Sequence, residues 1–305
     1  MARRPSEVGG LYALDKPSGI TSQTALTIAK RHLGVRKAGH SGTLDPLASG
    51  LLIVGVGTWS RLLAFIVGAD KTYHAVIRCG LRTDSLDITG AIQGVGWVPP
   101  TVDVQVVEEC LARLRGAIWQ TPPAFSALKV HGARAYELAR AGQDVALASR
   151  QVTISSLALL GLRRTGPFLD IELRVRCSSG TYIRSLASDL GDLLGTGATL
   201  FALRREAIGS VTLASASEPD VIGREQRLPL SLIFPEFGRF EVDETELVAA
   251  RNGRWLACPD SLASYREVIV LAAGDAPEFR RLVGIYRVVG DRLVPSRIVP
   301  TEGTT

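Results

Sequence analysis

Residues 39–50 read GHSGTLDPLASG, and the rest of the chain is interpreted outward from this stretch. Three glycines and a proline fix an irregular backbone here, and the apolar run at 51–55 predicts a buried strand directly after it. Asp45 is the only ionised acid in the stretch, so the loop presents a single carboxylate at the entrance of a strand. A tight turn in which Asp45 caps the backbone before Pro46 is the alternative that these residues leave open.

Strands and helices follow one another around this loop without a regular βαβ order. Apolar or alternating runs predict strands at 11–14, 51–55, 71–79, 152–160, 168–177, 199–205 and 208–213. Apolar residues at helical spacing predict helices at 22–33, 58–66 and 104–114, and a further helix with its apolar stripe at 183–194. A mixture of this kind indicates an α+β fold.

The last quarter of the chain has a different texture. Residues 218–235 carry prolines and charges and predict a boundary. Beyond it, short strands are expected at 268–271, 282–289 and 293–298. We therefore predict a large domain at 1–237 and a small β-rich domain at 238–305.

Composition describes an ordinary globular protein, with 46% hydrophobic and 21% charged residues among 305. No apolar run approaches the roughly 20 residues that a membrane helix needs, and the N-terminus carries no apolar segment typical of a secretory signal. The four cysteines have no CxxC spacing, which argues against a zinc site and favours buried free thiols in a reducing cytoplasm. A disulfide is the weaker alternative. We expect a cytoplasmic protein with no membrane contact and no metal.

Positive charge is concentrated near the Asp45 loop. Residues 1–67 hold eight Lys or Arg against three acids, whereas residues 238–305 hold nine against ten. Such an excess favours a polyanionic partner. The cluster Lys30, Arg31, Arg36 and Lys37 has two interpretations, a solvated helix end or a phosphate contact.

Residues 121–150 interleave basic and aromatic side chains. Lys129, Arg134 and Arg140 lie among Phe125 and Tyr136, a mixture that suits RNA backbone and splayed bases. A short amphipathic helix whose arginines extend to solvent is the equally weighted alternative.

Arg184 is expected in the first turn of the helix that carries the 183–194 stripe. A cation is unfavourable there because the helix dipole is positive at that end. Its position predicts that a specific anion holds it.

Four segments together resemble the TruB-type tRNA pseudouridine synthases. They are DKPSGITS at 15–22, GHSGTLDPLASGLL at 39–52, KTYHAVIRCGLRTDSLDITG at 71–90 and SGTYIRSLASDLG at 179–191, in the order of that family. The likeness covers residues 10 to about 215 and becomes weaker over the C-terminal part. Two positions depart from the pattern, because Cys79 replaces a larger aliphatic residue and Ser85 a threonine.

The resemblance implies a fold and an activity. The fold would be a mixed, largely antiparallel sheet of the pseudouridine synthase type, with 121–150 as a thumb-like RNA-binding insertion and 238–305 as a PUA-like RNA-binding domain. The activity would be conversion of the T-loop uridine at tRNA position 55 to pseudouridine, with tRNA as the partner of a monomeric enzyme. This isomerisation breaks the N1–C1′ bond and forms a C5–C1′ bond, and it needs no cofactor.

The resemblance also implies residue roles. Asp45 would be the catalytic carboxylate, Tyr73 would stack on the target uracil, and Arg184 would pair with Asp45 and keep it ionised. His40 would fill the gap that the uridine leaves, Leu203 would form an apolar wall, and Lys16 would brace the loop or contact phosphate. With the insertion, the expected RNA-contacting residues are His40, Lys16, Leu203, Lys129, Arg134 and Arg140.

Other functions stay open at this point. A non-catalytic RNA-binding or tRNA-folding protein would use the same groove, but it gains nothing from a carboxylate facing phosphates. A synthase acting on another RNA is a second alternative, and a hydrolase with Asp45 as nucleophile is the weakest because no second carboxylate has a suitable spacing. Attack at C1′, addition at C6 and removal of a ribose proton are all compatible with these residues.

Overall fold

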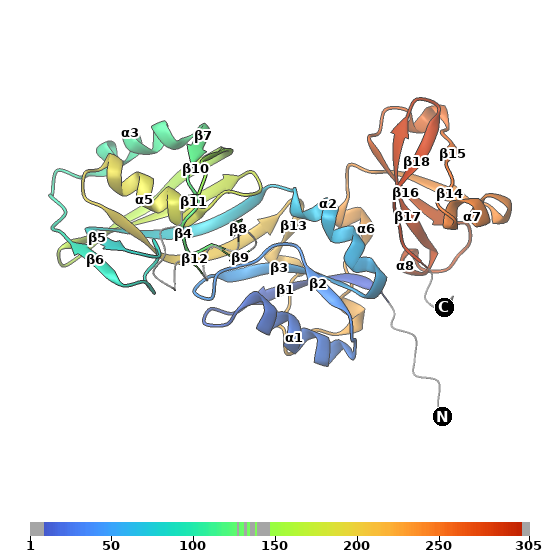
Figure 1. The fold of residues 1–305 in the computed structure, drawn as a ribbon, viewed down its shortest axis with the longest axis horizontal. Helices are drawn as coiled ribbons and strands as arrows, with labels where there is room; N and C mark the ends of the chain where they lie inside the picture. Colours follow the sequence, from blue (N-terminus) through green and yellow to red (C-terminus); the bar gives the residue numbers. More distant parts are fainter. Residues whose placement is uncertain (1–8, 127, 131–132, 135–137, 139–146, 301–305) are drawn as a thin grey trace. The chain divides into compact units, whose positions relative to one another are not determined.

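The computed structural model describes residues 9–126, 128–130, 133–134, 138 and 147–300 (Figure 1). The chain divides into two compact units. One comprises Met1–Pro46, Gly50–Val67 and Gly209–Thr305, and the other comprises Leu47–Ser49 and Gly68–Ile208. Helices and strands are mixed and antiparallel pairing predominates, which confirms the predicted α+β class.

In the N-terminal part of the first unit, paired strands are covered by one helix. Its strands and helices are β1 (Gly10–Lys16), α1 (Ser22–Leu33), β2 (Ala38–His40), β3 (Ser49–Val56), the 3₁₀ helix η1 (Gly57–Leu62) and α2 (Leu63–Val67). β1 and β2 each pair antiparallel with β3. The inner side chains of α1 and of these strands form one core, which includes Tyr12, Leu14, Ala25, Leu26, Leu52 and Val54.

Two local signals explain α1. Thr21 caps its start by accepting a hydrogen bond from the Thr24 N–H at 3.0 Å, and Gly34 ends it with a φ of 65°. The predicted helix at 58–66 is instead a 3₁₀ helix that runs into the short α2. The predicted strand at 208–213 is also wrong in part. Ile208 is the last residue of the preceding strand, residues 209–210 form a turn, Val211–Thr212 (β13) is extended, and a 3₁₀ helix begins at Leu213.

The second unit is an antiparallel sheet with helices packed on it (Figure 1). Its sheet runs in the order β12 (Ala198–Ile208), β4 (Lys71–Cys79), β11 (Phe168–Cys177), β10 (Arg150–Thr165) and β7 (Gly116–Gln120). The helix α5 (Ile183–Leu193) contacts β12 and β4, and α3 (Val104–Leu114) contacts β10 and α5. Two hairpins complete the unit, β5 (Leu81–Thr83) with β6 (Ile92–Val95) and β8 (Lys129–Val130) with β9 (Ala133–Arg134).

The C-terminal residues of the first unit form a second sheet with its own core. The strand order is β14 (Gly238–Val242), β16 (Glu267–Ala272), β17 (Leu282–Val289), β18 (Arg292–Ile298) and β15 (Leu256–Ala257). The helix α7 (Glu244–Arg251) packs on β14 and β17, and α8 (Glu278–Arg281) precedes β17. The three strands expected here are confirmed, while the PUA-like character and the boundary at residue 237 stay predictions.

The cysteines and the helices bear on two expectations. All four cysteines are free, and Cys79, Cys110 and Cys177 are buried as predicted, whereas Cys258 is half-buried. No helix in the described part of the chain has the length and apolar character needed to cross a membrane.

Candidate active site

The loop that carries Asp45 is supported from inside by Lys16. Lys16 is fully buried at the end of β1, and its ammonium donates to the carbonyls of Pro17 at 2.9 Å, Ile20 at 2.7 Å and Pro46 at 3.5 Å. Of the two roles predicted for Lys16, the structure therefore shows bracing. The predicted RNA contact of Lys16 stays a prediction.

The residues on either side of Asp45 are held through their peptide groups. The Ser22 hydroxyl donates to the Leu44 carbonyl at 3.1 Å and accepts from the Leu44 N–H at 2.8 Å. The Gly19 N–H donates to the Pro46 carbonyl at 2.7 Å. The backbone is thus held on both sides of Asp45, and Asp45 itself is half-buried.

His40 ends β2 at the start of the same loop. It is half-buried, and its Nδ1 accepts a long hydrogen bond of 3.4 Å from the Gly42 N–H. Lys16, at the end of β1, binds the loop that carries Asp45, and His40, at the end of β2, lies at its start.

Tyr73 and Leu203 lie on one face of the sheet in the second unit. Tyr73 is opposite Arg205 and Leu203 is opposite Ala75 in the β4–β12 register, which makes Tyr73 and Leu203 diagonal neighbours. Tyr73 is 8% exposed and Leu203 is half-buried. The predicted aromatic ring and apolar wall thus share a surface.

Arg184 is buried at the start of α5, with its side chain 5% exposed. Its Nη1 donates to the Ser85 carbonyl at 3.0 Å and its Nη2 to the Phe125 carbonyl at 2.9 Å. Its Nε lies 3.9 Å from the Asp87 carboxylate. The position of Arg184 in the first helical turn predicts a specific anion, and Asp87 is such an anion. The pairing of Arg184 with Asp45 stays a prediction.

Asp87 is itself aimed by its neighbours. Its Oδ1 accepts from the Ser85 hydroxyl at 3.0 Å and from the Thr89 N–H at 2.9 Å, while its Oδ2 faces Arg184. The carboxylate is 7% exposed. Sequence analysis missed this role, although Asp87 lies inside the segment 71–90 that carries the family resemblance.

Tyr182 is a second residue that sequence analysis missed. It is the N-cap residue of α5, it is half-buried, and the Arg150 guanidinium lies 4.9 Å from the centroid of its ring. The signal was present, since Tyr182 belongs to the SGTYIR segment, but an aromatic residue in a cap position has no local pattern that marks it.

Two titratable groups close to these residues have shifted pKa values. Burial and, to a smaller extent, the Arg205 cation lower the pKa of Lys71, two residues before Tyr73, to about 8. Burial raises the pKa of Asp189 on α5 to about 6, with a contribution from the nearby Asp192 carboxylate.

The insertion predicted at 121–150 is described in part. Lys129 and Arg134 are directly paired in the β8–β9 hairpin. Arg140 lies outside the described residues. The predicted RNA contacts of these three residues stay predictions.

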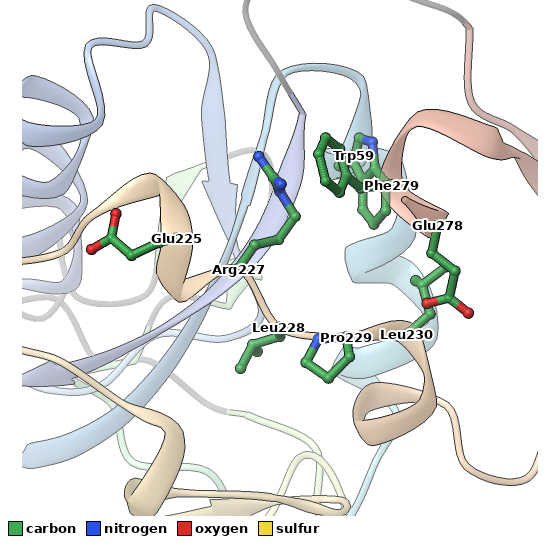
Figure 2. Close-up of a pocket in the computed structure, with 8 residues that line it drawn as sticks. All are labelled: Trp59, Glu225, Arg227, Leu228, Pro229, Leu230, Glu278 and Phe279. Carbon is green, nitrogen blue, oxygen red and sulfur yellow. The ribbon is translucent and has the colours of Figure 1, made fainter. Parts of the chain in front are cut away.

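A cavity of about 250 Å³ in the first unit contains none of the predicted residues (Figure 2). Trp59, Arg227 and Phe279 line it, and the Arg227 guanidinium stacks 3.8 Å from the centroid of the Phe279 ring. Glu225 and Glu278 also contribute to its wall. Packing of an arginine on an aromatic ring accounts for these side chains without a ligand.

Comparison with known proteins assigns the family. A family model described as TruB family pseudouridylate synthase (N terminal domain) matches residues 30–183. The chain belongs to the TruB family. Within this family, tRNA pseudouridine synthase B of Corynebacterium aurimucosum is 42% identical over 83% of this chain and 86% of its own length. The enzyme of the same name from Mycobacterium bovis is 40% identical over 93% of both chains.

A solved structure shares the fold. A chain of an H/ACA ribonucleoprotein bound to a substrate RNA containing 2′-deoxyuridine aligns with a TM-score of 0.68 over 98% of this TruB family chain and 89% of its own. Sequence identity is 20%, so this likeness shows the fold alone. The expected pseudouridine synthase fold is confirmed.

Proposed function

We propose that this TruB family protein isomerises the uridine at position 55 in the T loop of tRNA to pseudouridine. The relatives from Corynebacterium aurimucosum and Mycobacterium bovis are named tRNA pseudouridine synthase B, which supports tRNA as the substrate. The observation that carries the proposal is the Asp45 loop, where Lys16 and Ser22 fix the backbone and leave the carboxylate half-buried.

The reaction has simple requirements. The N1–C1′ bond of the uridine breaks, the uracil turns, C5 joins C1′, and the C5 proton is lost while N1 gains one, so atoms and electrons balance without an oxidant. A carboxylate at a fixed place can act on the ribose or on the base as the bond breaks. In this proposal Asp45 is that group.

The target base is stacked inside a folded loop and must be extruded, at a cost of a few kcal/mol. Stacking on an aromatic ring returns about 1–3 kcal/mol per base. The Tyr73 ring, with Leu203 as its diagonal neighbour, offers such a surface. In this proposal Arg184 is the cation of the active site. Two carbonyls and the Asp87 carboxylate hold its guanidinium in one orientation.

A direct assay tests the activity. The protein is incubated with an unmodified T stem-loop RNA, without cofactors, and pseudouridine is mapped in the product. We expect conversion at the one uridine that corresponds to position 55. Conversion at another position, or only in a different RNA, would favour the alternative of a synthase for another site, and no conversion with tight RNA binding would favour a non-catalytic RNA-binding protein.

The Asp45→Asn variant tests the assignment of the carboxylate. It keeps the size of the side chain and removes its charge, so we expect at least roughly a 1000-fold loss of turnover with RNA affinity unchanged. Asp220→Asn, at an exposed position, is the matched control and should be as active as the wild type. Appreciable turnover by Asp45→Asn would contradict the assignment.

For the C-terminal residues 238–305 we propose RNA binding at one depression. This depression, of about 500 Å³, is lined by Arg254, Trp255, Arg292 and Pro295 among others. Trp255 is 53% exposed, and the Arg292 guanidinium lies 4.2 Å from the centroid of its ring. The Asp291 carboxylate lies 3.8 Å from the Arg292 Nε. An exposed indole beside arginines suits a stacked base and its phosphate. Trp255→Ala should weaken binding of full-length tRNA; unchanged affinity would contradict this role.

A further inference from the structure

Gln120 is a buried amide at the end of an exposed strand. It closes β7, the last strand in the sheet of the second unit, and its side chain is 1% exposed while the other four residues of β7 are exposed or half-buried. A buried carboxamide is costly unless its donor and its acceptor are both satisfied. The partners of Gln120 therefore show what its burial achieves.

Both polar atoms of this amide bind the backbone of one distant residue. The Gln120 Oε1 accepts from the Tyr182 N–H at 2.7 Å, and the Gln120 Nε2 donates to the Tyr182 carbonyl at 3.0 Å. The same carbonyl accepts from the Leu186 N–H at 3.1 Å, which is the first hydrogen bond of α5. Tyr182 is the N-cap of α5 and makes no side-chain cap hydrogen bond, so the Gln120 amide holds the residue from which the helix starts.

Two further hydrogen bonds join the same two segments. The Ser185 hydroxyl donates to the Thr121 carbonyl at 2.7 Å, and the Arg184 Nη2 donates to the Phe125 carbonyl at 2.9 Å. Residues 120–125 therefore bind the first turn of α5 at three successive points. A shift of the helix start would move the Arg184 guanidinium relative to Ser85 and Asp87.

We propose that Gln120 is a positioning residue for pseudouridine formation. By binding both the N–H and the carbonyl of Tyr182, the Gln120 amide holds the two peptide groups that flank this residue and so fixes the Tyr182 ring and the Arg184 guanidinium. Only a primary carboxamide offers a donor and an acceptor side by side, since glutamate at neutral pH only accepts and methionine does neither. The inference rests on the proposed function through the role of Arg184.

Three variants of the full-length protein test this role by single-turnover conversion of the T stem-loop RNA and by RNA affinity. Gln120→Met keeps the length of the side chain and removes both hydrogen bonds. We expect its conversion rate to fall roughly 10- to 100-fold, because small displacements at an active site are costly, with affinity for the RNA within about threefold of wild type. Gln151→Met, at an exposed position on the neighbouring β10, is the matched control and should convert at the wild-type rate.

Gln120→Glu separates positioning from a general loss of stability. At neutral pH the glutamate still accepts from the Tyr182 N–H but no longer donates to the Tyr182 carbonyl. Below about pH 5 a growing fraction is protonated and donates again. The ratio of the Gln120→Glu rate to the wild-type rate should therefore rise as the pH falls, whereas the Gln120→Met ratio should stay level. A level ratio for both variants would contradict the proposal.

Hydrogen exchange distinguishes failure of this inference from failure of the proposed function. The Tyr182 and Leu186 amides should exchange faster in Gln120→Met than in the wild type, whether or not the RNA is converted. A wild-type protein that makes no pseudouridine would contradict the proposed function. Unchanged exchange, an unchanged rate, or a loss of RNA affinity as large as the loss of rate would overturn the positioning role of Gln120.

Discussion

In the first unit, the peptide groups beside Asp45 are bound by Lys16 and Ser22, which lie 30 and 22 residues from their partners along the chain. In the second unit, Arg184 is bound by Ser85 and Phe125, which lie 99 and 59 residues away. The side chain of Asp45 is half-buried, while that of Arg184 is 5% exposed. At the Asp45 loop, the side chains of Lys16 and Ser22 bind backbone groups. A buried guanidinium has to be surrounded by acceptors.

The comparison separates two kinds of support. The side chains of Lys16 and Ser22 bind carbonyl and N–H groups of the Asp45 loop, so the geometry of this loop depends on a few side chains. Around Arg184, carbonyls from two loops and the Asp87 carboxylate converge from distant parts of the chain, and the Gln120 amide binds the backbone of Tyr182, two residues before it. The second arrangement depends on the whole unit being folded.

After Asp45→Asn, the largest expected effect is that of Arg184→Lys. A lysine ammonium cannot reach the Ser85 and Phe125 carbonyls in the geometry of the guanidinium fork. We expect pseudouridine formation to fall roughly 100- to 1000-fold, the loss typical of removing a preorganised charged donor. Arg163→Lys, whose side chain is 74% exposed, serves as the matched control in the same assay. Wild-type turnover by Arg184→Lys would show that the buried cation is structural only.

A smaller effect is expected from Lys16→Met. The variant leaves the carbonyls of Pro17, Ile20 and Pro46 without their ammonium donor, although it also removes the cost of burying a charge. We expect the free energy of unfolding to fall by about 2–4 kcal/mol, together with a loss of activity, measured by denaturant titration and by the conversion assay. Lys37→Met, at an exposed position of the same unit, should unfold like the wild type. Unchanged stability would mean that the loop holds its shape without Lys16.

The smallest effect is expected from Asp189→Asn and depends on pH. The pKa of Asp189 is raised to about 6 in the folded protein, so between pH 4 and 6 the folded state binds more protons than the unfolded state. The wild type therefore loses stability as the pH rises through this window. At pH 7 the variant should be more stable by about 1–3 kcal/mol, and the difference should vanish below pH 4. Thermal unfolding across this range measures it, with the exposed Asp275→Asn as control.

Sequence analysis predicted features that depend on residues within a single helix or strand. The helix at 22–33 and the strand at 71–79 are each predicted from a pattern within one element, and both are confirmed. The helix expected at 58–66 failed because apolar spacing does not separate a 3₁₀ turn from an α turn over so few residues.

Contacts between residues far apart in the chain could not be predicted from the sequence. The partnership of Asp87 with Arg184, or of Gln120 with Tyr182, leaves no trace in the residues around either member. Arg184 was recognisable as misplaced because a cation at a helix start conflicts with the dipole, but the conflict does not name the anion. For Lys16 the sequence left two roles, and the carbonyl partners that show the bracing role could not be read from the residues around it.

The hydrogen bonds from Lys16 to carbonyl oxygens also have an evolutionary consequence. Every amino acid carries such an oxygen, so the chain can exchange residues at positions 17, 20 and 46 and keep these attachment points wherever the new residue tolerates the local backbone angles. Position 16 has no such freedom, because the ammonium exists in one side chain only. In a saturation library, positions 17, 20 and 46 should thus tolerate many substitutions, whereas position 16 should tolerate almost none.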